Sequence, residues 1–514
     1  MQDASERDVV EVAGLSTRLK VGMEVHVELA TRSKMWTAAP NVAHPDYFDA
    51  EPNTLIDPIV IGMPGTLPVM NREAVAMSIR VGLALGCEIA GYTKWDRKSY
   101  YYPDLPKNYQ ISQYDLPICG AGELEAPIDD SPDAPRRTVR ITRAHLEEDA
   151  GKLMHEAPGG RPIDHSIVDL NRAGTPLLEI VTEPDITSAE QAVMFGRTLR
   201  NICRFLGVSE GVMQRGQMRF EPNINVIVER GGKEYATPIA EIKNLNSFKA
   251  VHQAIRYEHV RQVERFLEDG QTLASGNKAT RGWDDGRGAT VLQREKEEAH
   301  DYRYFPDPDL VPVVVGADWL EQLRSGIPEL PLERERRYVE ALGLDVKQAR
   351  PLAAERDVCL MFEGLMEAGV AARRAAAVML NNLARRANDR GVLQTELPIT
   401  VAQVAGIEKL LAANKVSSNA AERLYDLCLE AGDRGEAAEP AALAEAHNLI
   451  QVSDDGALDE WCERAIGDDP ETAAQVRGGN DKAIGRLVGS VMKLSKGQAN
   501  PKSVQRKLRE KLSG

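Results

Sequence analysis

The residues best suited to chemistry near the start of the chain are two glutamates and a histidine that alternate with apolar residues. Between residues 21 and 29, Glu24, His26 and Glu28 share one parity, and methionine, valine and leucine share the other. This period of two predicts a β-strand with one apolar and one polar face. Same-face residues on a strand lie roughly 6.6 Å apart, so the three polar groups project into one space. They can hold a cation or do acid–base chemistry, and a solvated strand face is the alternative.

Further acidic residues stand at strand-like positions later in the chain. Glu147 and Glu148 belong to a run of three acids, which is costly unless solvent or a cation neutralises it. Glu179 interrupts the apolar run Leu-Leu-Glu-Ile-Val, where a buried acid needs a partner, and a salt bridge in the core is the alternative. Glu221 lies on the polar face of an alternating stretch with Arg219 and Asn223.

A single concave sheet surface could carry all of these groups. If Glu24, His26 and the later acids converge there, they form a site for a hard cation such as Mg²⁺ with nucleotide phosphates, because Mg²⁺ prefers carboxylate oxygens and water. Sequence alone does not establish that the strands lie side by side.

The elements that must position these residues follow from periodicity, turn and cap signals. We expect a β-rich region to about residue 310, with strands at 138–142, 167–171, 177–182 and 218–228. Helices are predicted over 70–86, from a Thr187–Glu190 capping box to Gly207, and from 248 to 270. After about residue 330 the chain becomes rich in Ala, Leu, Arg and Glu, which predicts helices, with a strong one at 371–389.

Length and composition limit the class of protein. A chain of 514 residues is too long for one core, so two to four domains are expected. No apolar run approaches the ~18 residues that span a bilayer, and the acidic N-terminus does not resemble a signal peptide. The six cysteines lie far apart without a Cys-x-x-Cys pair, which indicates reduced thiols in a cytoplasmic protein.

The charge is distributed unevenly along the chain. From Arg477 onward ten basic side chains face two acidic ones, a net of +8 in a chain of −15. Such polarity is typical of a module that meets nucleic-acid phosphates, and a solvated basic helix is the alternative. The candidate RNA-binding residues in this tail are Lys493, Lys496, Lys502 and Arg506.

Several long motifs together resemble one family, the B subunits of the bacterial tRNA-dependent amidotransferases (GatB). The matching stretches are Gly-Met-Glu-Val-His-Val-Glu (22–28), Tyr-Tyr-Pro-Asp-Leu-Pro-Lys-Asn-Tyr-Gln-Ile-Ser-Gln (101–113), His-Leu-Glu-Glu-Asp-Ala-Gly-Lys (145–152), the run from Asp169 to Asp185, Lys-Asn-Leu-Asn-Ser (243–247), Asp-Tyr-Arg-Tyr-Phe-Pro-Asp-Pro-Asp (301–309) and Ser-Lys-Gly-Gln-Ala-Asn-Pro (495–501). The resemblance covers nearly the whole chain from about residue 18.

The resemblance implies an α+β architecture in four parts. A disordered lead over residues 1–17 would precede a β-rich catalytic cradle at 18–310. A connector and all-α middle domain would follow at 311–445, and a basic, α-helical YqeY-like tail at 446–514. The cradle would take ATP, metal and the acceptor end of tRNA, and the tail would hold the tRNA body.

The resemblance also implies a reaction. A family member is a ligase that works in a heterotrimer, together with the amidase-type A subunit of the enzyme and its small C subunit. It uses ATP and Mg²⁺ to phosphorylate the side-chain carboxylate of Glu-tRNA(Gln) or Asp-tRNA(Asn). Ammonia that the amidase-type partner frees from glutamine then displaces the phosphate, which gives Gln-tRNA or Asn-tRNA. Such enzymes belong to EC class 6.3.5.

Site residues are carried over by the same resemblance. One metal set corresponds to His26, Glu148 and Glu179, and a second to Glu24, Glu147 and Glu221. Lys98 corresponds to a residue beside the ammonia exit, where Glu148 would also remove a proton. Polar support for ATP or substrate is expected from Arg219, Asn223, Lys243 and Asn246.

Two departures from the family pattern matter. Many relatives carry a zinc knuckle, but here the corresponding stretches read Thr37-Ala38-Ala39 and 57–60 without cysteine, so no structural zinc is expected. Glu221 stands where many relatives have aspartate, with Pro222 after it, which changes the geometry of the second metal set. A non-enzymatic tRNA-binding scaffold is the rival hypothesis, and the intact acids argue against it. An archaeal-type relative would carry an inserted domain for which this chain has no room.

Overall fold

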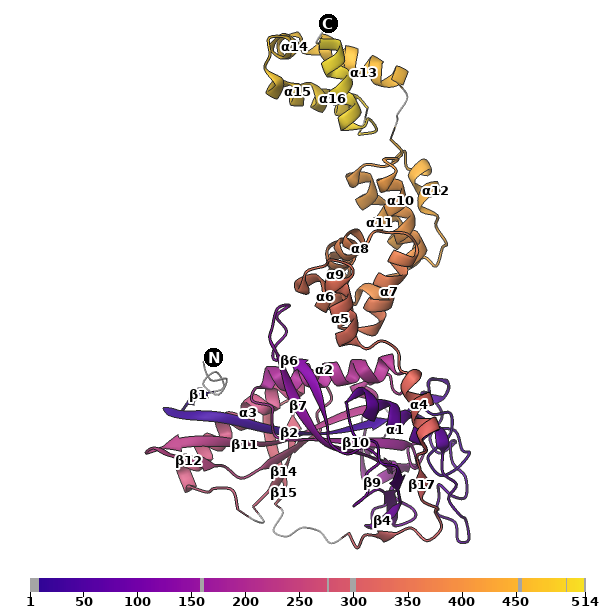
Figure 1. Ribbon diagram of the computed structural model, residues 1–514, viewed down its shortest axis with the longest axis vertical. Helices are drawn as coiled ribbons and strands as arrows, with labels where there is room; N and C mark the ends of the chain where they lie inside the picture. The colour runs from indigo at the N-terminus through magenta and orange to yellow at the C-terminus, as the bar shows by residue number, and fades with distance from the viewer. Residues whose placement is uncertain are drawn as a thin grey trace. The chain divides into compact units, whose positions relative to one another are not determined.

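The computed structural model describes residues 9–157, 161–274, 277–295, 302–451, 455–495 and 497–512. The chain divides into two compact units, residues 1–334 and 335–514. The first is built on a large sheet with helices, and the second on helices (Figure 1). The predicted α+β class is confirmed. Among the described residues no helix combines the length and apolar character needed to cross a membrane.

The main sheet has ten strands, in the order β15-β14-β13-β11-β2-β10-β7-β6, with β1 beside β2 and β12 beside β11. Their bounds are Val9–Val12 (β1), Leu15–Glu28 (β2), Gly122–Pro127 (β6), Arg136–Glu148 (β7), Pro176–Thr182 (β10), Met218–Arg230 (β11), Lys233–Ala236 (β12), Ala240–Lys243 (β13), Ala279–Asp284 (β14) and Ala289–Glu295 (β15). Smaller sheets pair β16 (Phe305–Pro306), β4 (Asp96–Ser99) and β5 (Tyr109–Ser112), then β17 (Val313–Val314) with β3 (Tyr92–Thr93), and β8 (Lys152–Ala157) with β9 (Arg161–Asp169).

Strand β2 lies in the middle of the sheet and organises its two faces. Met23, Val25 and Val27 are at most 1% exposed and form part of the main hydrophobic core. That core is completed by helices α1 (Arg72–Ala84), α2 (Ala189–Phe205) and α3 (Phe248–Asp269), of which α2 and α3 lie along one side of the sheet (Figure 1). The alternation in the sequence therefore predicted both the strand and its apolar face correctly, and the polar face carries the candidate site.

Some predicted boundaries shift. The N-cap of α2 is Ser188, whose hydroxyl accepts the Gln191 N–H at 3.0 Å, and not Thr187, whose own N–H bonds the Gln191 side chain. Strand β7 runs on to Glu148, well past the predicted end at residue 142. Residues 9–17, expected within a lead without structure, instead form β1 and the start of β2.

From Ala317 onward the described residues are mainly helical. The helix bounds are Ala317–Ser325 (α4), Pro331–Glu340 (α5), Val346–Ala353 (α6), Arg356–Glu367 (α7), Ala372–Ala377 (α8), Ala384–Arg390 (α9), Val401–Ala412 (α10), Ser418–Asp433 (α11), Pro440–Ala446 (α12), Asp455–Asp468 (α13), Pro470–Arg477 (α14), Ile484–Leu494 (α15) and Pro501–Leu512 (α16). A π-helical turn over Val378–Leu383 joins α8 to α9, so the predicted helix at 371–389 is present with a local widening. Helices α13 to α16 enclose a small core of their own, from Leu458 to Leu512.

A fully buried lysine holds the loop that leads into β10. The Lys34 ammonium donates to the carbonyl oxygens of Leu170, Asn171 and Ala173 at 3.3, 2.8 and 2.6 Å. Burial lowers the pKa of Lys34 to about 7, against the opposing charge of Asp57. The lysine therefore replaces solvent for three backbone acceptors in a turn next to the candidate site.

Lys34→Met should lower the free energy of unfolding by about 1–3 kcal/mol, because buried carbonyls lose their donor. The pKa of Lys34 is depressed in the folded state, so between pH 7 and 10 the unfolded chain binds more protons and stability rises with pH. That rise should be larger in the wild type than in the variant. Urea unfolding at pH 7 and pH 9 measures both effects, with exposed Lys20→Met as the control. Equal pH dependence in all three proteins would contradict this role.

Candidate functional site

Four strands bring one row of polar residues together across the sheet. Glu179 on β10 lies opposite His26 of β2 on one side and opposite His145 of β7 on the other. Arg219 on β11 lies opposite His26 and extends the row. Directly opposed residues have Cβ atoms about 4.5–5.5 Å apart, so these side chains meet on the polar face. The row joins segments that are far apart in the sequence.

Two groups of possible cation ligands share Glu179. His26 Nε2 lies 3.6 Å from Glu24 Oε1 and 3.6 Å from Glu179 Oε2. His145 Nε2 lies 3.6 Å from Glu179 Oε2 and 3.9 Å from Glu147 Oε2. In each group the ligand atoms lie within 4.8 Å of one another. Carboxylate oxygens with an imidazole suit Mg²⁺, and the imidazole also suits Mn²⁺.

The electrostatics of these groups favour a bound cation. Burial, and then the charge of Glu179, raise the pKa of Glu24 to about 7. Burial would also raise the pKa of Glu179, but its hydrogen bond from His26 and the charges of His145 and Lys98 lower it. Acids this close repel one another, and a cation would relieve the repulsion. The Nδ1 atoms of His26 and His145 are buried without a hydrogen-bond partner among the described residues.

Glu148 lies on the other face of β7. Its Oε1 atom accepts the N–H of Ile111 at 3.0 Å and pairs with Lys107. Because successive residues on a strand point to opposite faces, Glu147 shares the face of His145 and Glu148 does not. The set that the resemblance implies, His26 with Glu148 and Glu179, is therefore not assembled among the described residues; Glu147 is the acid beside Glu179.

The second implied set is also divided. Glu221 lies opposite Glu24 in the β11–β2 pairing, as that set requires. However, Glu221 forms an ion pair with Lys243, which also lies 3.0 Å from Glu241. Glu147 belongs to the His145 group on the far side of Glu179. Glu24 and Glu221 are thus brought together, and Glu147 stands apart from them.

Lys98 extends the same polar face from strand β4. The charges of Glu147 and Glu179 raise its pKa although burial opposes this, so the ammonium stays charged. Its Nζ atom lies 5.3 Å from the centre of the Tyr302 ring, a distance suited to a cation–π contact. The structure therefore puts this lysine beside Glu147 and Glu179, and not beside Glu148, with which the resemblance associates it.

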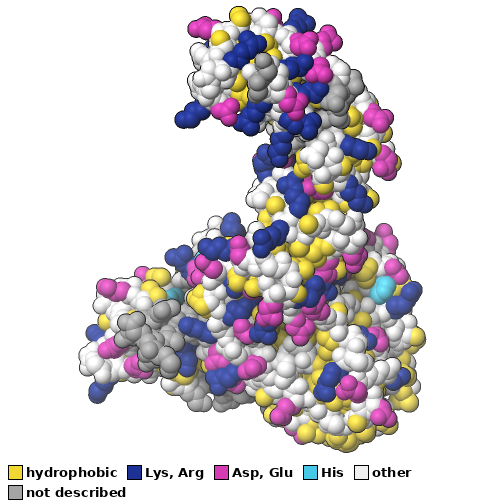
Figure 2. Space-filling model, turned by 45° about the horizontal axis from the view of Figure 1, so that its top comes forward, with side chains coloured by type: hydrophobic (Ala, Val, Ile, Leu, Met, Phe, Trp, Pro, Cys, Tyr) yellow, Lys and Arg dark blue, Asp and Glu magenta, His cyan; other side chains and the backbone are white. Residues whose placement is uncertain are grey.

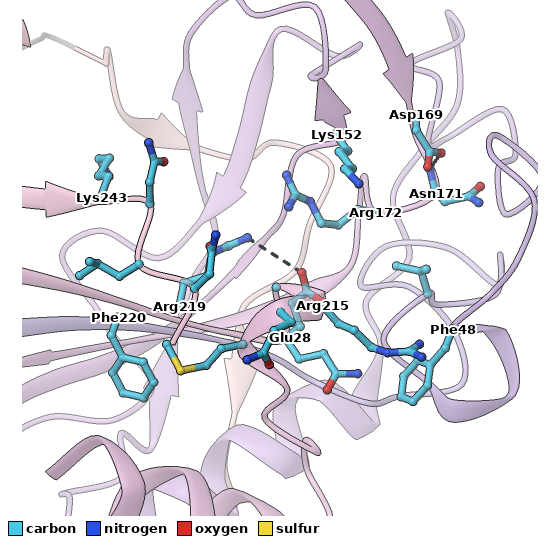
Figure 3. Close-up of a pocket in the computed structure, with 18 of the residues that line it drawn as sticks. Glu28, Phe48, Lys152, Asp169, Asn171, Arg172, Arg215, Arg219, Phe220 and Lys243 are labelled. Carbon is cyan, nitrogen blue, oxygen red and sulfur yellow. Dashed lines mark hydrogen bonds and ion pairs between the residues drawn. The ribbon is translucent and has the colours of Figure 1, made fainter. Parts of the chain in front are cut away.

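A pocket of about 590 Å³ adjoins the acidic groups (Figure 3). Five basic residues line it: Lys152, Arg172, Arg215, Arg219 and Lys243. Arg219 donates to Asp149 Oδ2 at 2.8 Å and lies 3.9 Å from Glu28 Oε1. Figure 3 shows Arg172, Arg219 and Lys152 converging on one space. The lining also includes four acids, which are Glu28, Asp49, Asp169 and Glu221. The basic side chains are the ones suited to binding phosphate groups.

The expected polar support is only partly at this pocket. Asn246 lines it together with Lys243 and Arg219. Asn223 is not among the lining residues described, and its buried Oδ1 has no hydrogen-bond partner in the described part of the chain. Sequence reasoning assigned no role to His145 or Asp149. Their signal was present, because both share the parity of Glu147 in the run from 145 to 149.

The basic residues of the tail differ in how far other charges neutralise them. Lys507 and Lys511 pair with Asp459 of α13 at 2.9 and 3.1 Å. Lys493, Lys502 and Arg506 are exposed, and Arg506 Nε lies 3.9 Å from Glu510 Oε1. Figure 2 shows acidic side chains interspersed with basic ones on the face of the protein in view. Lys496 lies outside the described residues.

The two histidine–carboxylate groups and the basic residues of the adjoining pocket make this face of the sheet the candidate functional site. Residues 19–321 match the family model described as the GatB/GatE catalytic domain, and residues 360–512 match the GatB domain. The chain belongs to the GatB family.

Curated relatives match over nearly their whole length. The chain is 43% identical to the B subunit of the aspartyl/glutamyl-tRNA(Asn/Gln) amidotransferase of Geotalea daltonii, over 97% of this chain and 99% of the relative. It is 41% identical to the protein of the same name from Caldicellulosiruptor saccharolyticus, over 96% and 98%. The Rhodopirellula baltica protein of that name is also 41% identical, over 95% of both chains.

The neighbouring acids of β7 offer a matched test of the metal ligands. Glu147→Gln should weaken Mn²⁺ binding to the full chain by about tenfold or more, because it removes a ligand oxygen beside His145. Glu148→Gln should leave Mn²⁺ binding within about twofold, because that side chain faces Lys107. Calorimetric titration measures both affinities, and melting temperatures check the folding. The reverse result would mean that the set of His26, Glu148 and Glu179 forms when metal binds.

Proposed function

We propose that this chain is the B subunit of an aspartyl/glutamyl-tRNA(Asn/Gln) amidotransferase, a ligase with glutamine as the amido donor. Family membership and identity over nearly the whole chain support the proposal. The observation that carries it is the pair of histidine–carboxylate groups sharing Glu179 beside a pocket lined by cations. A tRNA-binding scaffold without catalysis would need neither the crowded acids nor that pocket.

The proposed chemistry explains why acids and cations are both required. A carboxylate is a poor acyl donor, because its leaving group would be oxide. Transfer of the ATP γ-phosphoryl group to the side-chain carboxylate on tRNA gives an acyl phosphate and ADP. Ammonia then bonds to the acyl carbon, the bond to phosphate breaks, and the nitrogen loses a proton. Phosphoryl transfer depends on positioning and charge neutralisation more than on covalent help.

Each group of the site has a proposed role in this sequence. Glu24, His26 and Glu179 would hold one Mg²⁺ or Mn²⁺ ion, and His145, Glu147 and Glu179 would hold a second. The ions would neutralise charge on the phosphates. Arg219, Arg172 and Lys243 would bind phosphate oxygens from the walls of the pocket, and Asn246 would orient the nucleotide.

Lys98 and the aromatic side chains near it would serve the second step. The lysine lies next to Glu147 and Glu179, and Tyr302 and Tyr304 form an edge-to-face ring pair with centres 6.3 Å apart. A route sheltered from water would keep ammonia unprotonated until it reaches the acyl phosphate. We propose that Lys98 orients the acyl phosphate there. Glu147, rather than Glu148, would accept the proton, because it lies near Lys98 on the same face.

We propose that the segment that carries zinc ligands in many relatives is held here without metal. Thr37 donates a hydrogen bond to Asp57 Oδ2. Asp57 Oδ1 accepts the N–H groups of Ile59 and Val60 at 3.0 and 2.9 Å. These hydrogen bonds hold the two stretches against each other.

The proposed assembly adds the amidase-type A subunit to this chain, together with the small C subunit, and the assembled enzyme would act in the cytoplasm.

Reconstitution with these two further subunits tests the proposed function. The mixture holds ATP, Mg²⁺ and tRNA charged with labelled glutamate or aspartate, with glutamine or ammonium as nitrogen source. Appearance of labelled Gln-tRNA or Asn-tRNA that depends on ATP establishes the reaction, and the preferred tRNA identifies the substrate. Absence of product from either nitrogen source, despite tight tRNA binding, would favour the scaffold.

The exposed tail lysines give a separate prediction for tRNA binding. Lys502→Gln should weaken tRNA binding and reduce the slope of log affinity against log salt by about 0.7–0.9, because one phosphate contact is lost. Lys511→Gln is the matched control on the same helix, since Asp459 and Glu463 already neutralise Lys511. Filter binding at several salt concentrations measures the slopes. Equal slopes in both variants and the wild type would remove Lys502 from the tRNA interface.

A further inference from the structure

A second cavity, of about 350 Å³, lies where the C-terminal half of α3 meets β13, β14 and β15. It shares no lining residue with the pocket described above. Arg281 of β14 lies opposite Ile242, a core residue on the helix side of the sheet. Lys243, the next residue, lines the first pocket. Because adjacent strand residues point to opposite faces, the two cavities take their side chains from opposite faces of the sheet.

Four cations and no carboxylate line this second cavity, among the residues that the structure describes. Arg261 and Arg265 come from α3, Lys278 from the segment before β14, and Arg281 from β14 itself. Pro238, Phe266 and Leu292 add apolar surface. A concave site of this size with a few convergent charges on an apolar wall is typical of small-ligand pockets.

The inner two arginines share one buried acid. Arg261 donates to Glu258 through Nε at 2.8 Å and Nη2 at 2.7 Å. Arg281 Nε lies 3.3 Å from the same carboxylate and donates to Thr290 Oγ1 at 2.8 Å. The Glu258 side chain is 0% exposed, so its carboxylate contacts both guanidiniums from the buried side of the cavity. Two positive charges therefore face one negative charge, and a positive charge remains at the wall of the cavity.

The excess positive charge affects the ionisation of Arg281. Burial, and then the like charge of Arg261, lower the pKa of Arg281. The cationic form of this guanidinium is thus less favourable here than in water, and an anion in the cavity would restore it. At the rim, Lys278 lies 3.2 Å from Glu241 and Arg265 pairs with Asp269, so the inner arginines supply the excess.

We propose that this cavity binds a phosphate group carried by a nucleotide, at a site separate from the one that performs the amidotransferase reaction. Guanidinium groups present planar, paired N–H donors that match phosphate oxygens. The base of the nucleotide would pack against the apolar wall formed by Phe266 and Leu292. The phosphate belongs either to a free nucleotide or to a nucleotide of bound RNA, and the inference does not depend on the amidotransferase reaction.

Titration with inorganic pyrophosphate tests the site on the full chain. Wild type should bind two equivalents, one at each cavity. Arg281→Gln should weaken one of them about tenfold or more, because a charge-assisted hydrogen bond is lost, and should leave the other unchanged. Arg287→Gln is the control for the loss of one positive charge. Arg287 lies in the turn between β14 and β15, and its side chain is 72% exposed. Pyrophosphate binding identical in Arg281→Gln and wild type would overturn the proposal.

Folding and the source of the phosphate are checked separately. Arg281→Gln leaves Glu258 paired one to one with Arg261, so its melting temperature without ligand should equal or exceed that of wild type. If that variant does not fold, the exposed Arg265→Gln should show a smaller loss at the same site. In the assembled enzyme, a tRNA KM raised with an unchanged ATP KM identifies RNA as the source. Weaker adenylate binding with an unchanged tRNA KM identifies a free nucleotide.

Discussion

The site depends on the shared position of Glu179 between two histidines. Strand β10 lies between β2 and β7, and it is this order that brings His26 and His145 to either side of one carboxylate. Both imidazoles lie 3.6 Å from the same oxygen. A carboxylate in an apolar strand would otherwise be costly, so its burial is tolerable only with these partners. The polar face of the sheet thus has a defined centre, around which the other acids, Lys98 and Arg219 are arranged.

Much of the fold could be predicted from local patterns, and the arrangement of the site could not. Alternation at 21–29 and 218–228 predicted β2 and β11 because burial of one face imposes a period of two. The order in which strands pair depends on long-range packing, which no local pattern contains. For that reason the sequence indicated which acids were candidate ligands, but not which of them lie together. A longer predicted strand over 136–148 would have separated Glu147 from Glu148 by parity alone.

Arg219 connects the acidic row to the pocket through a second carboxylate pair. Burial, and then the charge of Asp149, raise the pKa of Glu28 to about 8. Burial opposes ionisation of Asp149 too, but the charges of Arg172 and Arg219 lower its pKa to about 2. One acid of the pair is therefore ionised and fixes Arg219, and the other adds little competing charge. The guanidinium is held by Asp149, which directly follows β7, and this restraint limits the cost of ordering it when a phosphate binds.

The sheet also separates the two arginines beside Glu258 from the acids of the candidate site. On β13, Glu241 and Lys243 project to the face of the acidic groups, and Ile242 between them projects into the core. On the other face, Glu258 and the two arginines beside it form a network that is nearly closed and has one positive charge in excess. If those arginines shared a face with Glu221 and Glu24, direct ion pairs would form and neither set would need a ligand. The apolar layer between the faces prevents that contact, so the acids near Glu179 stay crowded on one face and the two arginines keep their excess positive charge on the other.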